Sequence, residues 1–318
     1  MIQISNLSKY FDDFCAVDNV SFTIQPGEVL GFLGPNGAGK STTMKIITGF
    51  LAPSSGDVSV LGHNVLKDPI SAQLEIGYLP EGAPAYADMT VSDALTFIAQ
   101  VRGFSGDELK RRIQNVVEKV ELQSVLGRRV ENLSKGYCRR LGIAQALIHD
   151  PKVLILDEPT DGLDPNQKHQ VRELIRNLSK EKTVIISTHI LEEVSAVCTR
   201  AMILSAGKVV FDGTPDDLAA KSDLHNAVRI RLQSSSQAIL TELESLNEVQ
   251  KVSQDDAGMI TVFPINGKAI LSAVNTVLHK YNSLVEELHV ESGQLDDVFR
   301  KVTLNNNQAR PVKQEQSA

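Results

Sequence analysis

A glycine-rich run that ends in lysine and serine is the segment of this sequence best suited to chemistry. Residues 34–41 read GPNGAGKS and fit the pattern G-x-x-x-x-G-K-[ST], between an apolar run at 29–33 and a helix-compatible stretch. In such a loop the backbone N–H groups surround phosphate oxygens, and the N-terminus of the following helix favours negative charge. The residues expected to bind the nucleotide phosphates are Gly34, Pro35, Asn36, Gly37, Ala38, Gly39, Lys40, Ser41 and Thr42.

Two residues of this loop have distinct expected roles. Lys40 would reach the β and γ phosphates, and Ser41 would ligate magnesium. The loop therefore predicts that the chain binds a nucleoside triphosphate. By itself it leaves kinases, GTPases and ATPases open.

Three further polar side chains come directly after apolar runs. Asp157 and Glu158 follow residues 153–156, and His189 follows residues 183–188. Because parallel strands present their carboxyl ends at the ligand-binding edge of a sheet, we expect these side chains to lie beside the loop. Asp157 would hold magnesium, directly or through water, and Glu158 would polarise the attacking water. No role is assigned to the other histidines, which are His63, His149, His169, His225, His279 and His289.

The elements that must position these side chains alternate between strand and helix. Alternating apolar residues within positions 2–24 indicate a β-rich N-terminal lobe. Buried strands at 29–33, 153–156 and 183–187, with a helix at 167–178 between the last two, favour a mostly parallel sheet.

A helical pattern occupies the region from about residue 82 to residue 150. Ser92 can cap a helix, and Ile113, Val116, Val117 and Val120 follow the spacing of one helix face. These residues are expected to form a helical subdomain.

The pattern changes again from about residue 224. Alternating apolar residues, a helical stripe at 270–278 and an extended stretch at 284–290 give the order strand, helix, strand, strand, helix, strand. That order is ferredoxin-like and predicts an accessory domain over residues 224–303. The polar residues 304–318 are expected to be a disordered tail.

Composition excludes several classes of protein. The 318 residues are 42% hydrophobic and 22% charged, close to the globular average. The net charge of -7 argues against a general binder of nucleic acid. Cys15, Cys138 and Cys198 are far apart and form no metal or redox pair. Apolar runs stay short of the roughly 18 residues that a membrane helix needs, so a soluble chain is expected.

An ordered set of motifs carries a resemblance to a known family. Residues 133–137, LSKGY, are similar to the signature LSGGQ, and 157–160, DEPT, resemble the second nucleotide motif. Residues 161–164, DGLD, resemble the loop that couples two subunits, and 187–189, STH, the switch histidine. With the glycine-rich loop before them, these motifs make residues 2–218 resemble the nucleotide-binding subunit of an ATP-binding cassette (ABC) transporter.

This resemblance implies a fold and a reaction. The fold is an α/β P-loop NTPase of the ABC ATPase type, with a mainly parallel sheet core, an antiparallel β subdomain and a helical subdomain over residues 1–223, followed by a small α+β extension. The reaction is ATP hydrolysis with ATP and Mg²⁺ as cofactors. Glu158 and His189 would be catalytic, with His189 contacting the γ-phosphate. The implied metal ligands are Ser41, Glu81 and Asp157.

The resemblance also implies partners. The signature of one copy closes on the nucleotide held by the other, so the expected assembly is a head-to-tail homodimer with two ATP. Ser134, Lys135, Gly136 and Asp164 would complete these nucleotide sites. The pair would power export through separate membrane permease subunits from the cytoplasm, peripheral on the inner face of the cytoplasmic membrane, without nucleic acid. The alternative is a soluble ABC ATPase that acts on ribosomes or DNA.

Some positions depart from the family pattern. Glu81 stands where many members have glutamine, which adds negative charge near the metal ligands. Lys135 replaces a glycine of the signature, and Tyr137 replaces a glutamine. The hydrogen bonds that this glutamine makes in relatives are therefore not expected in this chain. Phe11, or alternatively Tyr10, stands where the family places an aromatic ring on adenine. For the extension, a module that supports the dimer is favoured over a ligand sensor.

Overall fold

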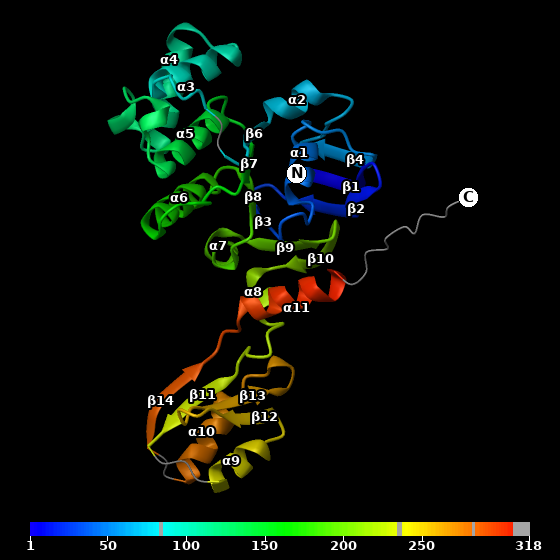
Figure 1. Ribbon diagram of the computed structural model, residues 1–318, viewed down its shortest axis with the longest axis vertical. Helices are drawn as coiled ribbons and strands as arrows, with labels where there is room; N and C mark the ends of the chain where they lie inside the picture. The colour runs from blue at the N-terminus through cyan, green and yellow to red at the C-terminus, as the bar shows by residue number, and fades with distance from the viewer. Residues whose placement is uncertain (83–84, 234–236, 282–283, 308–318) are drawn as a thin grey trace, which may run out of the picture. The chain divides into compact units, whose positions relative to one another are not determined.

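The computed structural model describes residues 1–82, 85–233, 237–281 and 284–307. The chain forms two compact units, one built mainly from Met1–Asp212 and the other from Gly213–Leu304. Figure 1 shows both units, which are described separately below. The domain ends expected at residues 223 and 303 stay predictions. Of the expected tail, residues 304–307 belong to the last helix, and 308–318 lie outside the described residues.

The central sheet of the first unit has the strand order β10-β9-β3-β8-β7-β6. β3 pairs in parallel with β8 and β9, and β7 pairs in parallel with β6 and β8. Every residue of β3, β7 and β8 is buried, which explains their continuous apolar sequences. The bounds are β3 Val29–Leu33, β6 Ile76–Leu79, β7 Val153–Asp157, β8 Thr183–Thr188, β9 Arg200–Ser205 and β10 Lys208–Gly213. The expected parallel core is confirmed.

A second, antiparallel sheet packs beside the glycine-rich loop, with the strand order β2-β1-β4-β5. The rings of Phe22 and Phe32 meet edge to face at 5.4 Å and join the core of this sheet to that of the central sheet. Its strands are β1 Ile2–Phe11, β2 Phe14–Ile24, β4 Ser55–Val60 and β5 His63–Asn64, and the neighbouring helices are α1 Lys40–Ile47 and α2 Pro69–Leu74.

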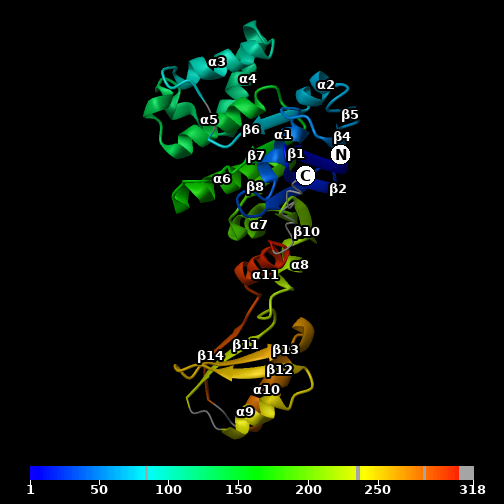
Figure 2. The ribbon, with the colours of Figure 1, turned by 45° about the vertical axis from the view of Figure 1, so that its right-hand side comes forward.

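The helical subdomain forms a separate group of helices that lies away from this antiparallel sheet (Figures 1 and 2). It contains α3 Val91–Val101, α4 Gly106–Lys119, η1 Gln123–Val125, η2 Val130–Asn132 and α5 Lys135–Leu147. The cap of α3 is Thr90 and not Ser92, because Thr90 Oγ1 accepts from the N–H of Asp93. Thr90 also forms a β-bridge with Arg129. Two more helices, α6 Pro165–Leu178 and α7 Leu191–Val197, follow β7 and β8.

The second unit contains an antiparallel sheet with the order β12-β13-β11-β14. Its elements follow the ferredoxin-like order, and α9 and α10 cover one face of the sheet (Figure 2). The bounds are α8 Pro215–Ala219, β11 Val228–Leu232, α9 Gln237–Glu244, β12 Val249–Gln254, β13 Ile260–Pro264, η3 Ile265–Gly267, α10 Leu271–Lys280, β14 Val285–Val290 and α11 Leu295–Asn307. Within the described ranges, every helix is too short or too polar to cross a lipid bilayer.

Candidate active site

The glycine-rich loop links β3 to α1, and two of its glycines are required by space. A Cβ atom on Gly34 would lie 2.5 Å from the carbonyl oxygen of Leu204. Gly39 has a φ of +104°, and its Cβ would lie 2.5 Å from the carbonyl oxygen of Ala16. A larger residue at either position would push the loop away from the sheet, so the local shape of the loop depends on these glycines.

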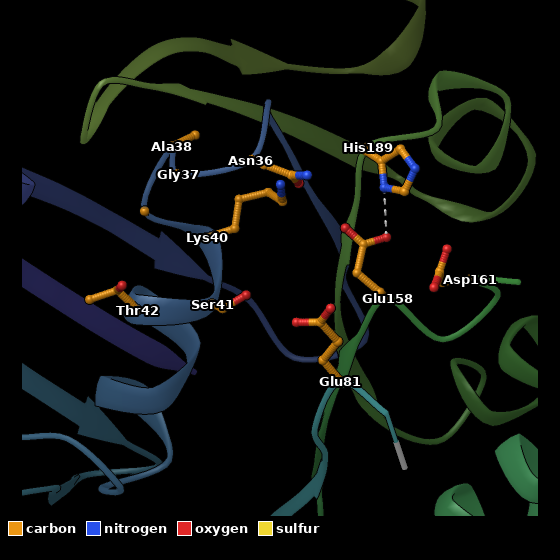
Figure 3. A pocket seen from close by; sticks show the side chains of 11 residues that line it. Asn36, Gly37, Ala38, Lys40, Ser41, Thr42, Glu81, Glu158, Asp161 and His189 are labelled. Carbon is orange, nitrogen blue, oxygen red and sulfur yellow. Dashed lines mark hydrogen bonds and ion pairs between the residues drawn. The ribbon is translucent and has the colours of Figure 1, made fainter.

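The loop forms one wall of a pocket of about 410 Å³ (Figure 3). Side chains from the ends of β6, β7 and β8 face it, as expected for the carboxyl edge of a parallel sheet. The lining residues are Asn36, Gly37, Ala38, Gly39, Lys40, Ser41, Thr42, Glu81, Glu158, Asp161 and His189. The structure thus brings most of the predicted phosphate-binding residues together with both predicted catalytic residues.

Lys40 is the fixed positive charge of this pocket. Its ammonium group is buried and donates to the carbonyl oxygens of Gly34 at 2.6 Å and Pro35 at 3.3 Å. Burial lowers the pKa of Lys40, while the carboxylates of Glu158, Asp157 and Glu81 act in the opposite direction. A phosphate in the pocket would supply the strong anionic partner that two backbone carbonyls only partly replace.

Glu158 and His189 form a direct pair. His189 Nδ1 lies 3.0 Å from Glu158 Oε2, the contact drawn in Figure 3. Burial raises the pKa of the Glu158 carboxyl above its ordinary value, whereas the hydrogen bond to His189 and the charge of Lys40 lower it. A carboxylate with a raised pKa, held beside a histidine, is suited to accept a proton from water.

The backbone of Glu158 is itself constrained. Its φ is +49°, in the left-handed region that costs a non-glycine residue roughly 1 kcal/mol. The N–H of Glu158 donates to the carbonyl oxygen of Ser187 at 3.2 Å and to Ser187 Oγ at 3.1 Å. These contacts with the end of β8 hold the carboxylate at the pocket.

Hard oxygen donors gather below the loop. Ser41 Oγ donates to Asp157 Oδ1 at 3.3 Å, and the buried Asp157 also accepts a hydrogen bond from Ser187 Oγ. Glu81 is exposed and lines the pocket on the same side (Figure 3). No cluster of three or more acidic, histidine or cysteine side chains able to hold a metal occurs among the residues described. This donor set fits Mg²⁺, which commonly takes one or two carboxylates and completes its shell with water and substrate phosphates.

The remaining predicted residues lie elsewhere. Ser134 and Gly136 line a second pocket of about 390 Å³, and the Ser134 side chain caps α5. Lys135 is exposed at the start of α5, and Asp164 caps α6. Phe11 is 45% exposed at the end of β1 and is not part of the loop pocket. The roles of these residues toward a nucleotide stay predictions.

Sequence reasoning missed two residues of the site. Asp161 lines the pocket, whereas the sequence identifies it only as part of the DGLD motif. Ser187 holds both Asp157 and the backbone of Glu158. The available signal was a serine next to the last residue of an apolar strand, and the structure pairs β7 and β8 at Asp157 and Ser187.

A glycine-rich loop between a strand and a helix, with carboxylates at the end of another parallel strand of the same sheet, defines the class of P-loop nucleoside triphosphatases. Residues 17–161 match the family described as ABC transporter. The linearmycin resistance ATP-binding protein LnrL of Bacillus subtilis is 31% identical over 95% of this chain and 98% of its own length. The chain therefore belongs to the ATP-binding subunits of ABC transporters, and it binds and hydrolyses ATP.

Two further comparisons support this assignment. A Nod factor export ATP-binding protein of Cupriavidus metallidurans is 35% identical over 69% of this chain and 72% of its own length. An ABC cassette solved as a dimer in a post-hydrolysis state with ADP and Pi has a TM-score of 0.61 and 26% identity, and covers 68% of this chain and 99% of its own. The expected ABC ATPase fold and activity are confirmed.

Proposed function

We propose that this chain hydrolyses ATP to drive export through separate integral membrane permease subunits. The observation that carries the hydrolysis in this proposal is the contact between Glu158 and His189 at the pocket that contains Lys40. The names of the two relatives, which concern resistance and export, support export as the process. The chain would act in the cytoplasm, peripheral on the inner face of the cytoplasmic membrane.

Each residue has a defined task in the proposed reaction. Lys40 and the loop N–H groups bind the β and γ phosphates, Glu158 accepts a proton from the attacking water, and His189 contacts the γ-phosphate. Ser41 and Asp157, with Glu81 nearby, would hold Mg²⁺, which neutralises phosphate charge when it is bound.

We propose a head-to-tail homodimer as the working ATPase. The dimeric cassette solved with ADP and Pi supports this choice. In one chain the signature residues Ser134 and Gly136 line a pocket separate from that of Lys40, so a second copy would supply them to the nucleotide. Phe11 is the proposed contact for adenine.

The second unit is proposed to support this dimer. β14 is an edge strand of its sheet, and all of its residues are exposed. Val285, Leu288 and Val290 on this strand are 42%, 37% and 37% exposed. An exposed edge with apolar side chains is suited to pairing with another chain.

The alternative of a soluble ABC ATPase acting on ribosomes or DNA gains no support from the relatives. Their names concern resistance and export, and the net charge of -7 does not favour contacts with phosphate backbones.

Mixing two inactive variants tests the head-to-tail dimer. Lys40→Ala removes the positive charge that is proposed to bind phosphate. Ser134→Asp keeps a good helix cap but places a carboxylate where the resemblance expects phosphate. Each variant alone should be inactive, whereas a mixture contains dimers with one intact site and should regain ATPase activity. Continued inactivity of a mixture that does form mixed dimers, seen with two affinity tags, would contradict the arrangement.

Fractionation of cells tests the membrane partner. The tagged chain should sediment with membranes, be released by alkaline carbonate and cross-link to an integral membrane protein. Recovery entirely in the soluble fraction, at native expression level, would contradict the proposed location.

A further inference from the structure

A buried carboxylate lies behind the active-site pocket, on the first turn of α7. Glu193 is only 4% exposed, yet it carries an acidic side chain. Its Oε2 accepts a hydrogen bond from Thr188 Oγ1 at 2.7 Å, and its Oε1 accepts one from Thr160 Oγ1. Thr160 and Thr188 are 2% and 1% exposed, so water does not compete for these bonds.

The two threonines belong to the segments that carry the catalytic pair. Thr160 stands two positions after Glu158 in the turn where the N–H of Asp161 donates to the carbonyl oxygen of Glu158 at 3.3 Å. Thr188 directly precedes His189, and its Oγ1 accepts from the N–H of Ile190 at 3.0 Å. Glu193 therefore ties the end of β8 to the turn after β7.

The surroundings of Glu193 leave little room for another arrangement. Arg172 on α6 brings its Nη2 to 3.9 Å from Glu193 Oε1. The neighbouring cavity, lined by Arg172, Glu193 and Cys198 among others, is about 10 Å³, room for about one water at most. Loss of the carboxylate would leave buried hydroxyl donors and a guanidinium without an acceptor. The end of β8 and the turn after β7 would then be free to move apart.

We propose that Glu193 is a positioning residue of the ATPase reaction. It sets the separation between His189 and Glu158 by holding Thr188 and Thr160 on one carboxylate. This proposal rests on the roles given above to Glu158 and His189. A purely structural role predicts instead that stability, nucleotide affinity and turnover all decline together.

The test compares Glu193→Gln and Glu193→Ala with Glu192→Gln, an exposed glutamate on the same helix turn. We measure kcat, the Kd for a fluorescent ATP analogue and the melting temperature. Small displacements of catalytic groups cost up to about 10²-fold, so Glu193→Ala should lower kcat by about that factor while the Kd stays within about twofold. Glu193→Gln, which keeps the shape and one acceptor, should recover part of the loss, and Glu192→Gln should match the parent chain.

Thr188→Val is a second variant, which keeps the volume of the side chain. It tests the same contact if Glu193→Ala does not fold. It should lower kcat, and its combination with Glu193→Gln should cost less than the product of the single effects, because both remove the same contact. An unchanged kcat in both Glu193→Gln and Thr188→Val, or a Kd that weakens in step with kcat, would overturn the proposal. Glu158→Gln distinguishes a failure of the proposed function from a failure of the positioning role. If Glu158→Gln retains parental turnover, the catalytic role assigned to Glu158 is wrong. If Glu158→Gln is inactive while the Glu193 variants are fully active, only the positioning role of Glu193 is rejected.

Discussion

The imidazole of His189 lies within hydrogen-bond distance of the Glu158 carboxylate, with Nδ1 and Oε2 3.0 Å apart. The two side chains come from the ends of adjacent parallel strands, β8 and β7. His189 is 48% exposed at its side chain and Glu158 only 13%, so the histidine is the solvent-facing partner and the carboxylate the enclosed one. This asymmetry suits a base that must stay in place and a histidine that responds to the γ-phosphate.

Glu158→Gln should abolish most turnover and leave ATP bound. The amide cannot accept the proton of water, and loss of a general base typically costs about 10²–10⁴-fold. Lys40 and the loop are unchanged, so the affinity for ATP should persist and an ATP-dependent dimer should accumulate on size exclusion. Hydrolysis at the parental rate would show that another group activates the water.

Lys40→Ala should instead lose nucleotide affinity. The variant removes the buried ammonium group that faces the loop, while Glu158 and His189 keep their contact. Titration with a fluorescent ATP analogue gives the Kd, and Lys45→Ala, an exposed lysine on the same helix, is the control. An unaltered Kd in Lys40→Ala would contradict the phosphate-binding role.

His189→Ala should move the acid limb of the pH–rate profile. Burial raises the pKa of Glu158, and the hydrogen bond from His189 lowers it. Without His189 the pKa of Glu158 rises further, so the carboxylate becomes protonated at a higher pH. The residual kcat at saturating ATP should therefore fall off at higher pH than in the parent chain. A limb that stays in place or moves to lower pH would disprove this coupling.

His149 should make the folded state less stable in acid. Burial, together with the charge of Arg102, lowers the pKa of His149 to about 4 from an ordinary 6.5. His149 Nε2 forms a hydrogen bond with the carbonyl oxygen of Ile76. Between these values the unfolded chain binds more protons, so the free energy of unfolding falls as pH drops from 6.5 toward 4. Urea midpoints should decline less over this range in His149→Gln than in the exposed control His279→Gln. Equal declines would contradict it.

The positions of residues at strand ends could be predicted from the sequence, whereas their roles stay predictions. The loop, Asp157, Glu158 and His189 follow directly from strand ends in a parallel sheet, which chain order already implies. The link from Thr160 through Glu193 to Thr188 was not predictable, because it depends on how α7 packs behind the pocket. The choice of Thr90 over Ser92 as a cap was not predictable either, since both residue types cap helices well; Thr90 also forms a bridge with the distant Arg129.

Glu81→Gln tests whether residue 81 acts at the metal. Glu81 is exposed, lines the pocket and raises the pKa of Lys40 through its charge. Glutamine keeps an oxygen but removes one negative charge beside Asp157 and Glu158. Lower repulsion of the phosphates should tighten the binding of magnesium and ATP while hydrolysis continues.

Titration of ATPase activity with magnesium decides this last question. The half-saturating magnesium concentration should fall in Glu81→Gln and stay at the parental value in Glu118→Gln, an exposed glutamate on α4 outside the pocket. Both variants remove one charge from the same unit, so a general change in net charge would move them equally. Superimposable curves for the parent chain and Glu81→Gln would remove Glu81 from the metal site, because a charge beside the bound magnesium and phosphates must change their affinity.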